Sequence, residues 1–552
     1  MERRIRLLIR VYGRPFAVPF STQHWPSWRI FATLRAVLAK VYSAAVYGVD
    51  AFEVEIEVNG ASGNGVIVVV GLPDVAVKES KDRVTTAIQN SGYRWPRGRT
   101  TINLAPADVK KEGPSFDLPI ALAMVAVGAE MELLNVEQYC FVGELALTGQ
   151  VRPVKGVLPV ALEARRAGRR AIVVPIENAR EAAMVDGIEI YGVRNLREAF
   201  EFLTGEKSLT PIREDVTQFF AEHQNYDVDF ADVRGQHHVK RAIEVAVAGN
   251  HNALFIGPPG SGKSMIAKRI PTIIPPMSLE EAIESTKIHS ICGLLLDPAR
   301  SFVTTRPFRS PHHTISDIAL IGGGATPTPG EISVAHNGVL FLDELPEFRR
   351  QTLEVLRQPL EDSRVTISRA TGSLTFPADF MLIAAMNPCK CGYFSDPKRE
   401  CRCSPNDVQR YRDRISGPLL DRIDIHVEVP AVQYQDISSK TPGEPSASIR
   451  ERIIKAREIQ RERFAKNGGS KSKVRCNSRM SAQLLKRHCA LDESAEGMMK
   501  MAMTELNFSA RAYDRILKVA RTIADLADSE NILADHVGEA IQYRTLDRNL
   551  WA

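Results

Sequence analysis

The sequence predicts an α/β protein of three folded units, two of them α/β and the last one helical. Strand-like and helix-like runs alternate over residues 38–204 and again over residues 226–430, which is typical of sheets covered by helices. Residues 205–225 are polar without a sustained apolar period, so we expect a linker there. Over residues 431–552 the apolar side chains recur at helical spacing. A chain of 552 residues is too long for one hydrophobic core, which agrees with this division.

Composition and charge are those of a folded globular protein. Apolar residues make up 44% and charged residues 25%, a balance that excludes a disordered chain. No apolar stretch approaches the length needed to cross a bilayer, so we expect a soluble, cytoplasmic protein without a membrane partner. The net charge of +5, from 71 basic and 66 acidic side chains, is too small to indicate a nucleic-acid partner by itself.

The first 37 residues stand apart from this pattern, because they are rich in arginine and almost free of acidic residues. A transit peptide has such a composition. We favour the interpretation that the true start lies near Val37, where an ordered pattern begins, and that residues 1–37 are an extension outside the fold.

The first unit, over residues 38–204, combines strands rich in β-branched residues with amphipathic helices. FEVEIEV at 52–58 and GVIVVVGLP at 65–73 are strand-like, and DVAVKESKDRVTTAIQNSG at 74–92 is helix-like. Later, helix-like LPVALEARRAG at 158–168 precedes strand-like RAIVVPIE at 170–177. These runs predict a compact α/β unit.

The second unit opens on a glycine-rich loop between a strand-like and a helix-like run, in HNALFIGPPGSGKSMIAKRI at 251–270. Glycines let backbone N–H groups surround a phosphate, Lys263 can reach the terminal phosphates of ATP, and Ser264 can offer its hydroxyl to Mg²⁺. The strand before and the helix after make this the strongest signal in the chain. We expect ATP to bind at Gly257, Pro258, Pro259, Gly260, Ser261, Gly262, Lys263 and Ser264.

Two later strand-like runs end in polar residues that would complete this site. GVLFLDELPEF places Asp343 and Glu344 at a strand end, where ligands bind in open α/β sheets. We expect Asp343 to hold Mg²⁺, directly or through water, and Glu344 to polarise the attacking water. FMLIAAMNP places Asn387 at another strand end, where it would orient the water or sense the γ-phosphate; a turn-forming Asn before Pro388 is the alternative.

Four cysteines gather in CKCGYFSDPKRECRC, as two Cys-x-Cys pairs separated by nine residues. Cys389, Cys391, Cys401 and Cys403 can enclose a tetrahedral Zn²⁺ that would order an otherwise loose loop. Reduced free thiols are the alternative.

The third unit is helical, beginning with the arginine-rich run SIRERIIKAREIQRERFAK at 448–466. The pair Gly468 and Gly469 breaks this helix, and helix-like runs resume at 481–507 and 515–544.

The order of these motifs resembles the AAA+ superfamily, and more closely its magnesium-chelatase-like branch, typified by the bacterial ComM/YifB proteins. The resemblance covers nearly everything from Leu38 onward. Its most specific pieces are RPFRSPHHTISDIALIGGG, PGEISVAHNGVLFLDELPEF, AAMNPCKCGYF, RYRDRISGPLLDRIDIHVEVP and SARAYDRILKVARTIADL. The resemblance implies an AAA+ core with a parallel sheet and a helical C-terminal lid.

The resemblance also implies roles for residues away from the strand ends. Arg422 in LLDRID would be an arginine finger presented to the ATP of a neighbouring subunit, which implies a hexameric ring. Arg511 in SARAYDR would be a second sensor that the lid swings onto the phosphates. In both cases a planar cation would stabilise the charge that spreads over the γ-phosphoryl oxygens. Val233 and Gln236 in DFADVRGQ would lie on the adenine side.

The first unit resembles the Lon-type protease fold, in which a serine of a GPS segment is activated by a lysine on a later helix. Ser115 in KKEGPSFDLPIALA occupies the place of the serine. Matching VRPVKGVLPVALEARRAG without a gap puts Leu158 at the lysine position, and leucine cannot remove a proton from serine. We therefore expect a proteolytically inactive unit; Lys155 would substitute only if the alignment slips.

Basic side chains suggest what such a motor acts on. Arg364 and Arg369 in the hairpin-like SRVTISRATGSLTFPADF, and His312 and His313 in SPHHT, could neutralise DNA phosphates without reading sequence; a solvated charged surface is the alternative. The resemblance implies a hexameric helicase that acts on single-stranded or branched DNA and drives branch migration in recombination or natural transformation. A chelatase-type ATPase that remodels a protein partner, and a nucleotide-binding scaffold without motor activity, are the alternatives.

Overall fold

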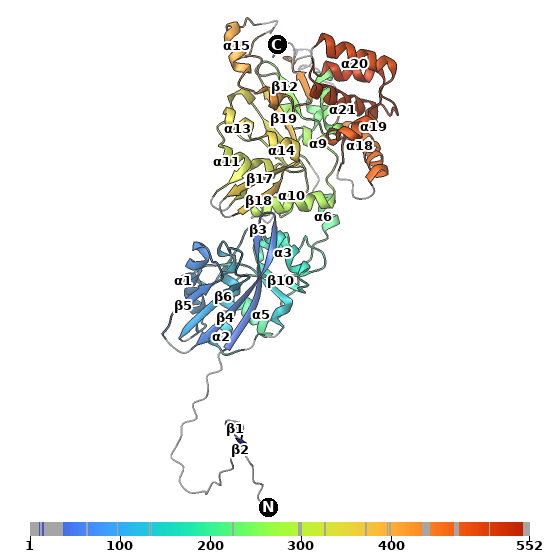
Figure 1. Cartoon of the computed structure of the whole chain (residues 1–552). Coiled ribbons are helices and arrows are strands. Elements are labelled where there is room, and N and C mark those ends of the chain that lie inside the picture. The colour runs from blue at the N-terminus through green and yellow to red at the C-terminus, as the bar shows by residue number, and fades with distance from the viewer. Residues whose placement is uncertain are drawn as a thin grey trace, which may run out of the picture.

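A computed structural model confirms the predicted α/β fold class (Figure 1). It describes residues 10–11, 14–15, 37–61, 64–96, 98–131, 133, 135–222, 226–295, 301–324, 327–369, 372–394, 396, 399–432, 442–468, 474–506 and 508–544. The predicted extension 1–37 lies mostly outside these residues, apart from a short ladder of β1 (Arg10–Val11) and β2 (Arg14–Pro15). Within the described ranges, no helix is long and apolar enough to cross a bilayer.

The N-terminal module, residues 37–204, contains three described sheets, the smallest of them the pair β8-β9, and the helices that cover them. Its strands are β3 (Val37–Tyr47), β4 (Asp50–Ala61), β5 (Ile67–Val70), β6 (Arg99–Ala105), β7 (Tyr139–Phe141), β8 (Glu144–Leu145), β9 (Val151–Arg152), β10 (Ala171–Pro175) and β11 (Glu189–Val193). Its helices are α1 (Val75–Asn90), α2 (Asp117–Gly128), α3 (Val157–Arg166), α4 (Ala179–Ala182) and α5 (Leu196–Thr204). One sheet has the order β3-β4-β6-β5, and the parallel one has the order β11-β10-β7.

The predicted elements of this module are present because their burial follows the expected periods. In β4, Val54, Ile56 and Val58 are buried while the glutamates between them are partly exposed, as an alternating strand requires. Helix α2 is buried along almost its whole length and packs against β3, β4 and α1, which explains why its sequence is apolar on every face.

The core module, residues 226–432, follows helix α6 (Val216–Glu222) and is built on a five-stranded parallel sheet. Its strands are β12 (Ala253–Ile256), β13 (Phe308–Arg309), β14 (Gly322–Gly323), β15 (Thr328–Pro329), β16 (Val339–Leu342), β17 (Arg364–Arg369), β18 (Gly372–Pro377), β19 (Met381–Met386) and β20 (Ile425–Glu428). Its helices are α7 (His237–Gly249), α8 (Lys263–Ala267), α9 (Ile270–Ile273), α10 (Leu279–Ile291), α11 (Asp317–Ile321), α12 (Glu331–Val334), α13 (Arg350–Glu354), α14 (Arg357–Asp362), α15 (Pro405–Arg412) and α16 (Gly417–Leu420).

The main sheet of the core module is buried on both faces and has the strand order β13-β16-β19-β12-β20. Alternate residues of β12 point to opposite sides: Ala253 and Phe255 join one hydrophobic core, and Leu254 and Ile256 join another. Parallel strands covered on both faces have uninterrupted apolar sequences. That is why β12, β16 and β19 were predictable as strands from the sequence.

The helical module, residues 442–544, packs beside the core module (red in Figure 1). Its helices are α18 (Ser446–Gly468), α19 (Ala482–His488), α20 (Glu493–Glu505), α21 (Ala510–Leu526) and α22 (Ala534–Gln542). Buried His251 of the core module connects the two, because its ring nitrogens lie 3.0 Å from Asp424 Oδ2 and 2.9 Å from Thr522 Oγ1 of α21.

Helix α10 joins the core module to the N-terminal module, where it packs against α3. The buried carboxylate of Glu181 accepts a hydrogen bond of 2.9 Å from the backbone N–H of Leu158 and another from the hydroxyl of Ser290 on α10. Met277, Ala282 and Phe302 of the core module complete a hydrophobic cluster whose other members come mostly from the N-terminal module. The two modules therefore share a packed interface.

Candidate functional site

Three neighbouring strands of the main sheet deliver the predicted nucleotide-site residues to one edge. The glycine-rich loop begins at Gly257 after β12, Asp343 follows β16, and Asn387 follows β19. The first of these strands in the chain, β12, lies between β19 and β20. Open α/β sheets bind ligands outside the carboxyl ends of their strands at such a reversal of strand order.

The glycine-rich loop has the open backbone that phosphate binding requires. Gly260 and Gly262 have φ angles of +77° and +91°, in the left-handed region that favours glycine, and a Cβ atom on either would meet nothing within 4 Å. Gly257 is needed for a different reason, since a Cβ atom there would lie 2.0 Å from the carbonyl oxygen of Val429. The loop is therefore anchored at its start and open at its turn.

Lys263 and Ser264 connect the loop to the other two strand ends. Lys263 Nζ donates to the carbonyl oxygens of Gly257 at 2.8 Å and Pro258 at 2.9 Å, and to Asn387 Oδ1 at 3.2 Å. Burial lowers the pKa of Lys263, while Asp343 and Glu344 oppose that shift.

The hydroxyl of Ser264 lies 2.5 Å from Asp343 Oδ2. Ser264 lies on α8, which follows β12 and the glycine-rich loop, and Asp343 follows β16; both strands end at the same sheet edge. A hydroxyl beside a carboxylate is an oxygen donor pair of the kind that binds Mg²⁺. The residues present therefore fit the expected metal.

Glu344 is half exposed and has a φ of +52°, which is uncommon for a residue other than glycine. Its backbone N–H donates to Asp343 Oδ1 at 2.9 Å. His313 Nδ1 lies 3.4 Å from Glu344 Oε2, and the ring of His312 lies 4.0 Å from that of His313. His313, one of the expected DNA contacts, thus lies against Glu344 at the nucleotide site.

Val233 and Gln236 line a pocket of about 480 Å³ together with Ser261 and Gly262 of the loop. The side-chain N–H groups of Gln236 donate to the carbonyl oxygens of Ser261 and Pro430, both at 3.0 Å. Both residues expected on the adenine side therefore line one pocket with the glycine-rich loop.

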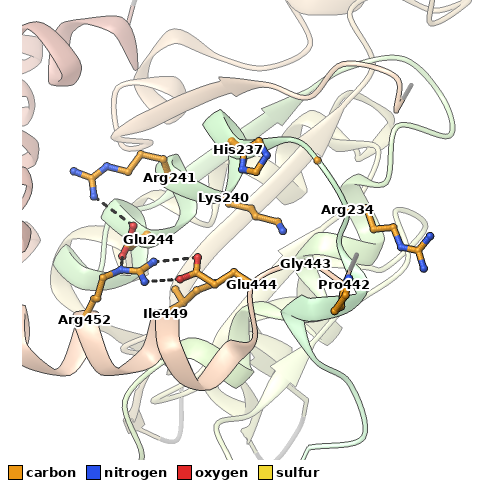
Figure 2. A pocket seen from close by; sticks show the side chains of 11 residues that line it. Arg234, His237, Lys240, Arg241, Glu244, Pro442, Gly443, Glu444, Ile449 and Arg452 are labelled. Atoms are coloured by element: carbon orange, nitrogen blue, oxygen red, sulfur yellow. Dashed lines mark hydrogen bonds and ion pairs between the residues drawn. The ribbon is translucent and has the colours of Figure 1, made fainter. Parts of the chain in front are cut away.

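A second pocket, of about 390 Å³, adjoins the first through Arg234 and is rich in charge (Figure 2). Two of its arginines are paired within the pocket: Arg241 lies 3.3 Å from Glu244, and Arg452 contacts both Glu244 and Glu444 at 2.5 Å. The pair of Arg452 with Glu244 joins α18 to α7.

Arg422 and Arg511 lie together at the opposite edge of the sheet from the glycine-rich loop. Asn252, which precedes β12, donates its side-chain N–H to the carbonyl oxygen of Arg422 at 2.9 Å, and β20 runs parallel to β12. Arg422 Nη2 lies 2.5 Å from Glu361 Oε1, and Arg511 Nη1 lies 3.7 Å from Asp421 Oδ2. All four side chains line one pocket of about 150 Å³.

Arg511, the expected second sensor, lies beside Arg422, among side chains that include none of the glycine-rich loop of the same chain. The reason is the packing of α21 against the amino-terminal side of the sheet, where Arg515 reaches Asp424 Oδ1 at 2.6 Å.

The predicted hairpin is formed by β17 and β18, which separates its two arginines. Arg364 pairs with Pro377 at the base, and Arg369 pairs with Gly372 near the turn. Both arginines are exposed, whereas Val365 and Ile367 are buried on the other face. Only Arg369 therefore lies near the end of the hairpin.

The residues that a Lon-type site would use are not brought together by any contact that the described chain shows. Ser115 lies in a short 3-10 turn (Pro114–Phe116), where its carbonyl oxygen accepts from Gly143 N–H at 2.9 Å. Leu158 is fully buried on α3. The side chain of Lys155 packs against Gly293 at the end of α10.

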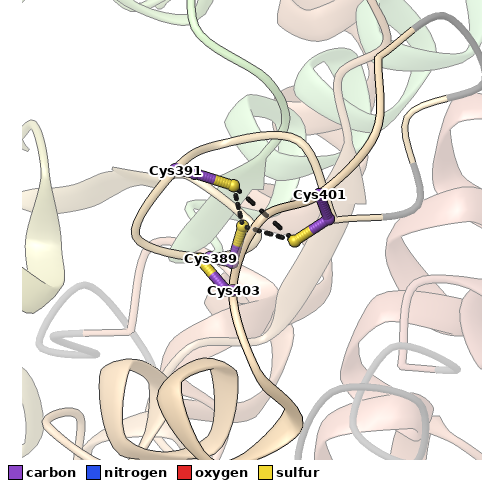
Figure 3. A group of neighbouring side chains, drawn as sticks. All are labelled: Cys389, Cys391, Cys401 and Cys403. Atoms are coloured by element: carbon purple, nitrogen blue, oxygen red, sulfur yellow. Dashed lines mark hydrogen bonds between the residues drawn. The ribbon is translucent and has the colours of Figure 1, made fainter.

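The four clustered cysteines converge as predicted, with their sulfur atoms all within 4.8 Å of one another (Figure 3). Cys389 Sγ lies 3.3 Å from Cys391 Sγ and 3.7 Å from Cys401 Sγ, and the last two sulfurs are 3.6 Å apart.

The sequence did not indicate two of the contacts described above. One is the ion pair of Glu361 with Arg422, and the other is the approach of His313 to Glu344. The strand that leads to His313, β13, has only two residues, so no strand-like run marked it. Glu361 lies on a polar helix whose sequence resembles any solvated surface, and only the fold brings it to Arg422.

Comparison with known proteins gives matches along almost the whole chain. Residues 56–178 match the model described as subunit ChlI of Mg-chelatase, residues 229–437 that of magnesium chelatase subunit ChlI, and residues 443–544 that of its C-terminal part. Lon protease 2 of Bacillus subtilis is 26% identical over 179 residues, 29% of this chain and 32% of that protein.

Full-length relatives are closer. Competence protein ComM of Haemophilus influenzae is 43% identical over 517 residues, which cover 93% of this chain and 98% of that protein. The protein YifB of Salmonella typhimurium is 44% identical over 515 residues, with the same coverage. The predicted resemblance is confirmed, and the chain belongs to the ComM/YifB family of magnesium-chelatase-like AAA+ proteins.

Proposed function

We propose that this chain is an ATPase that works as a ring and moves along DNA. Its family implies ATP and Mg²⁺ as ligands. The observation that carries the proposal is the meeting of Lys263, Asn387 and the Ser264–Asp343 pair at adjacent strand ends. These groups are the ones that phosphoryl transfer in P-loop proteins requires.

Each residue has a distinct task in this proposal. Ser264 and Asp343 would hold Mg²⁺, which when bound neutralises charge on the phosphates. Lys263 would bind the terminal phosphates, because its ammonium group lies among the carbonyl oxygens of the open loop. Glu344 would orient the attacking water and accept its proton, and Asn387 would fix the water or the γ-phosphate.

The position of Arg422 supports hydrolysis between subunits. Arg422 precedes β20, whereas the glycine-rich loop follows the parallel neighbour β12, so the two lie at opposite ends of these strands. A strand of four residues is about 13 Å long. Arg422 would therefore serve the ATP of a neighbouring subunit, and Arg511, which lies beside it, would do the same. Such head-to-tail contacts close into rings, and we propose a hexamer.

DNA is proposed as the substrate on two grounds. One relative carries the name competence protein ComM, and the hairpin of β17 and β18 exposes Arg364 and Arg369. Basic groups on a hairpin can hold a phosphate backbone without sequence preference. We propose branch migration of recombination intermediates, as in natural transformation, as the process served.

The test is ATP turnover by the full chain with and without single-stranded or branched DNA. Stimulation that disappears at high salt supports the proposal. Lys263→Ala should weaken nucleotide binding, whereas Glu344→Gln should bind ATP normally and fail to hydrolyse it. Normal hydrolysis by Glu344→Gln would contradict the assignment of the base, and particles imaged with ATP and DNA should be six-membered rings.

A second function is favoured by the descriptions of the matching family models, which all concern magnesium chelatase. In that case the ATPase would remodel a partner protein, and stimulation would require that protein rather than DNA. A chain that binds ATP and does not turn it over under either condition would be a scaffold.

For the N-terminal module we propose a role in packing or ring assembly without proteolysis. Leu158 stands at the position of the Lon lysine and is buried, so Ser115 lacks that base. Peptidase activity that is lost in Ser115→Ala would contradict this.

We also propose that Cys389, Cys391, Cys401 and Cys403 bind a structural Zn²⁺. Four thiolates suit this soft, tetrahedral cation, and a closed site without an open position is typical of structural zinc.

A further inference from the structure

The cysteine loop, residues 389–403, has the sulfur spacing of a tetrahedral metal site. Zn–S bonds of about 2.3 Å in a tetrahedron place sulfur atoms about 3.8 Å apart. The sulfurs of Cys389, Cys391 and Cys401 are separated by 3.3, 3.6 and 3.7 Å, far longer than a disulfide bond of about 2.0 Å, and that of Cys403 lies within 4.8 Å of all three. The sulfurs therefore lie as four ligands of one ion would.

The four sulfurs come from both ends of the loop. Cys389 and Cys391 belong to its start, and Cys401 and Cys403 to its end. An ion bound to all four would tie the two ends together.

The same loop rests on the glycine-rich loop of the nucleotide site. A Cβ atom on Gly392 would lie 2.5 Å from Cδ and 2.7 Å from Cγ of Pro259, so only glycine allows this approach. Gly392 also has a φ of +87°. Because a proline ring cannot move aside, the position of the cysteine loop limits the positions open to Pro259.

Both ends of the cysteine loop also lie close to Asn387. Asn387 precedes Cys389 by two residues. On α15, which follows Cys403, Arg412 Nε donates to the carbonyl oxygen of Pro388 at 3.2 Å and the guanidinium lies over the ring of Phe394. A metal ion bound to the four cysteines would fix both ends of the loop beside Asn387.

We propose that Zn²⁺ in the cysteine cluster positions Pro259 and Asn387, so that zinc and ATP·Mg²⁺ bind to this chain cooperatively. The inference rests on the proposed ATP site and adds a metal dependence to it. Thermodynamic linkage makes the effect reciprocal: if zinc tightens ATP binding, ATP must tighten zinc binding by the same factor.

The experiment uses the purified full chain and two binding measurements. Elemental analysis should find one zinc per chain. Competition with a chromogenic chelator should show zinc held about tenfold more tightly with a slowly hydrolysed ATP analogue and Mg²⁺ than without them, a coupling of ordinary size. Zinc removal by a mercurial and a chelator should weaken binding of a fluorescent ATP analogue by the same factor, and added zinc should restore it.

Variants separate zinc binding from the effect of zinc on ATP binding. Cys401→Ser with Cys403→Ser should lose the zinc and the tight ATP binding; Cys292→Ser, at a partly exposed cysteine outside the cluster, should lose neither. Gly392→Ala should keep the zinc and weaken ATP binding. Gly168→Ala is the matched control, because Gly168 has a φ of +77° and a Cβ atom there meets nothing within 4 Å.

The outcomes distinguish this inference from the proposed function. A chain without zinc overturns the inference, as does a zinc-bearing chain whose ATP affinity is unchanged by zinc removal. Lys263→Ala should retain zinc and lose the effect of the ATP analogue on zinc affinity. A wild-type chain that holds zinc but binds no adenine nucleotide overturns the ATP site itself, and the cooperativity with it.

Discussion

Glu344 combines two features that matter at the scale of single residues. Its left-handed backbone conformation costs on the order of 1 kcal/mol for a residue other than glycine, and such strain is often found at functional sites. Its carboxylate is half exposed, and Nδ1 of His313 lies 3.4 Å from Oε2. The imidazole therefore lies where it can orient the carboxylate.

Replacement of His313 by Ala should lower kcat for ATP about tenfold while the affinity for a fluorescent ATP analogue stays the same. The reason is that the general base would lose the group that orients it, and small displacements of such a base reduce the rate of the chemical step. Single-turnover hydrolysis together with equilibrium binding would check this.

His312→Ala is the matched control, since His312 is exposed and bonds to Thr314 rather than to Glu344. It should retain most of the turnover. A His313→Ala variant that hydrolyses ATP as fast as the wild type would show that Glu344 needs no such partner.

At the scale of elements, the hairpin of β17 and β18 places its two arginines at opposite ends, a difference that the sequence did not indicate. Its outer face carries paired hydroxyls, Thr366 with Thr375 and Ser368 with Ser373, both pairs at 3.1 Å. Arg369 lies beyond these rungs near the turn, whereas Arg364 lies at the base. A DNA strand that follows the end of the hairpin would meet Arg369 first.

Arg369→Ala should weaken binding of single-stranded DNA and reduce the slope of log K against log salt by about one, because one phosphate contact is lost. Arg364→Ala should change affinity and slope less. Fluorescence anisotropy at several salt concentrations measures both. Equal slopes for Arg369→Ala and the wild type would mean that this side chain does not contact phosphate.

The elements that the sequence predicted well are those whose environment is uniform. β12, β16 and β19 are buried on both faces, so every residue is apolar, and the glycine after β12 and the polar residues after β16 and β19 stand out. Two-residue strands such as β13 carry no periodic signal. The sequence also could not locate Arg511, because its place depends on how α21 packs against a sheet encoded far earlier in the chain.

At the scale of the whole molecule, the core module connects two partners that contact it in different ways. The N-terminal module is joined through α10 and the buried Glu181, and the helical module through buried His251. A displacement of either module would break buried hydrogen bonds, that of Ser290 with Glu181 in one case and that of His251 with Thr522 in the other. In the proposed ring, this continuity would let a subunit transmit the state of its nucleotide to its neighbours.

Arg422 allows the proposed ring to be tested by mixing subunits. Lys263→Ala should be nearly inactive because it loses the side chain that binds the terminal phosphates. Arg422→Ala should be nearly inactive because an arginine finger raises the rate on the order of a thousandfold. If Arg422 acts on the neighbouring subunit, a mixed ring contains interfaces with an intact lysine on one side and an intact arginine on the other. Random mixing at equal amounts should restore about a quarter of the wild-type ATPase rate, when interfaces act independently.

The matched control mixes Lys263→Ala with Glu344→Gln. Those two residues serve the same nucleotide from the same chain, because the loop after β12 and the end of β16 meet at one sheet edge. Every site in that mixture carries a defect, so no activity should return. Both mixtures are made before nucleotide and DNA are added, and ATP turnover is measured afterwards. Activity restored in neither mixture, with subunit exchange verified by fluorescence transfer, would show that Arg422 does not act across the interface.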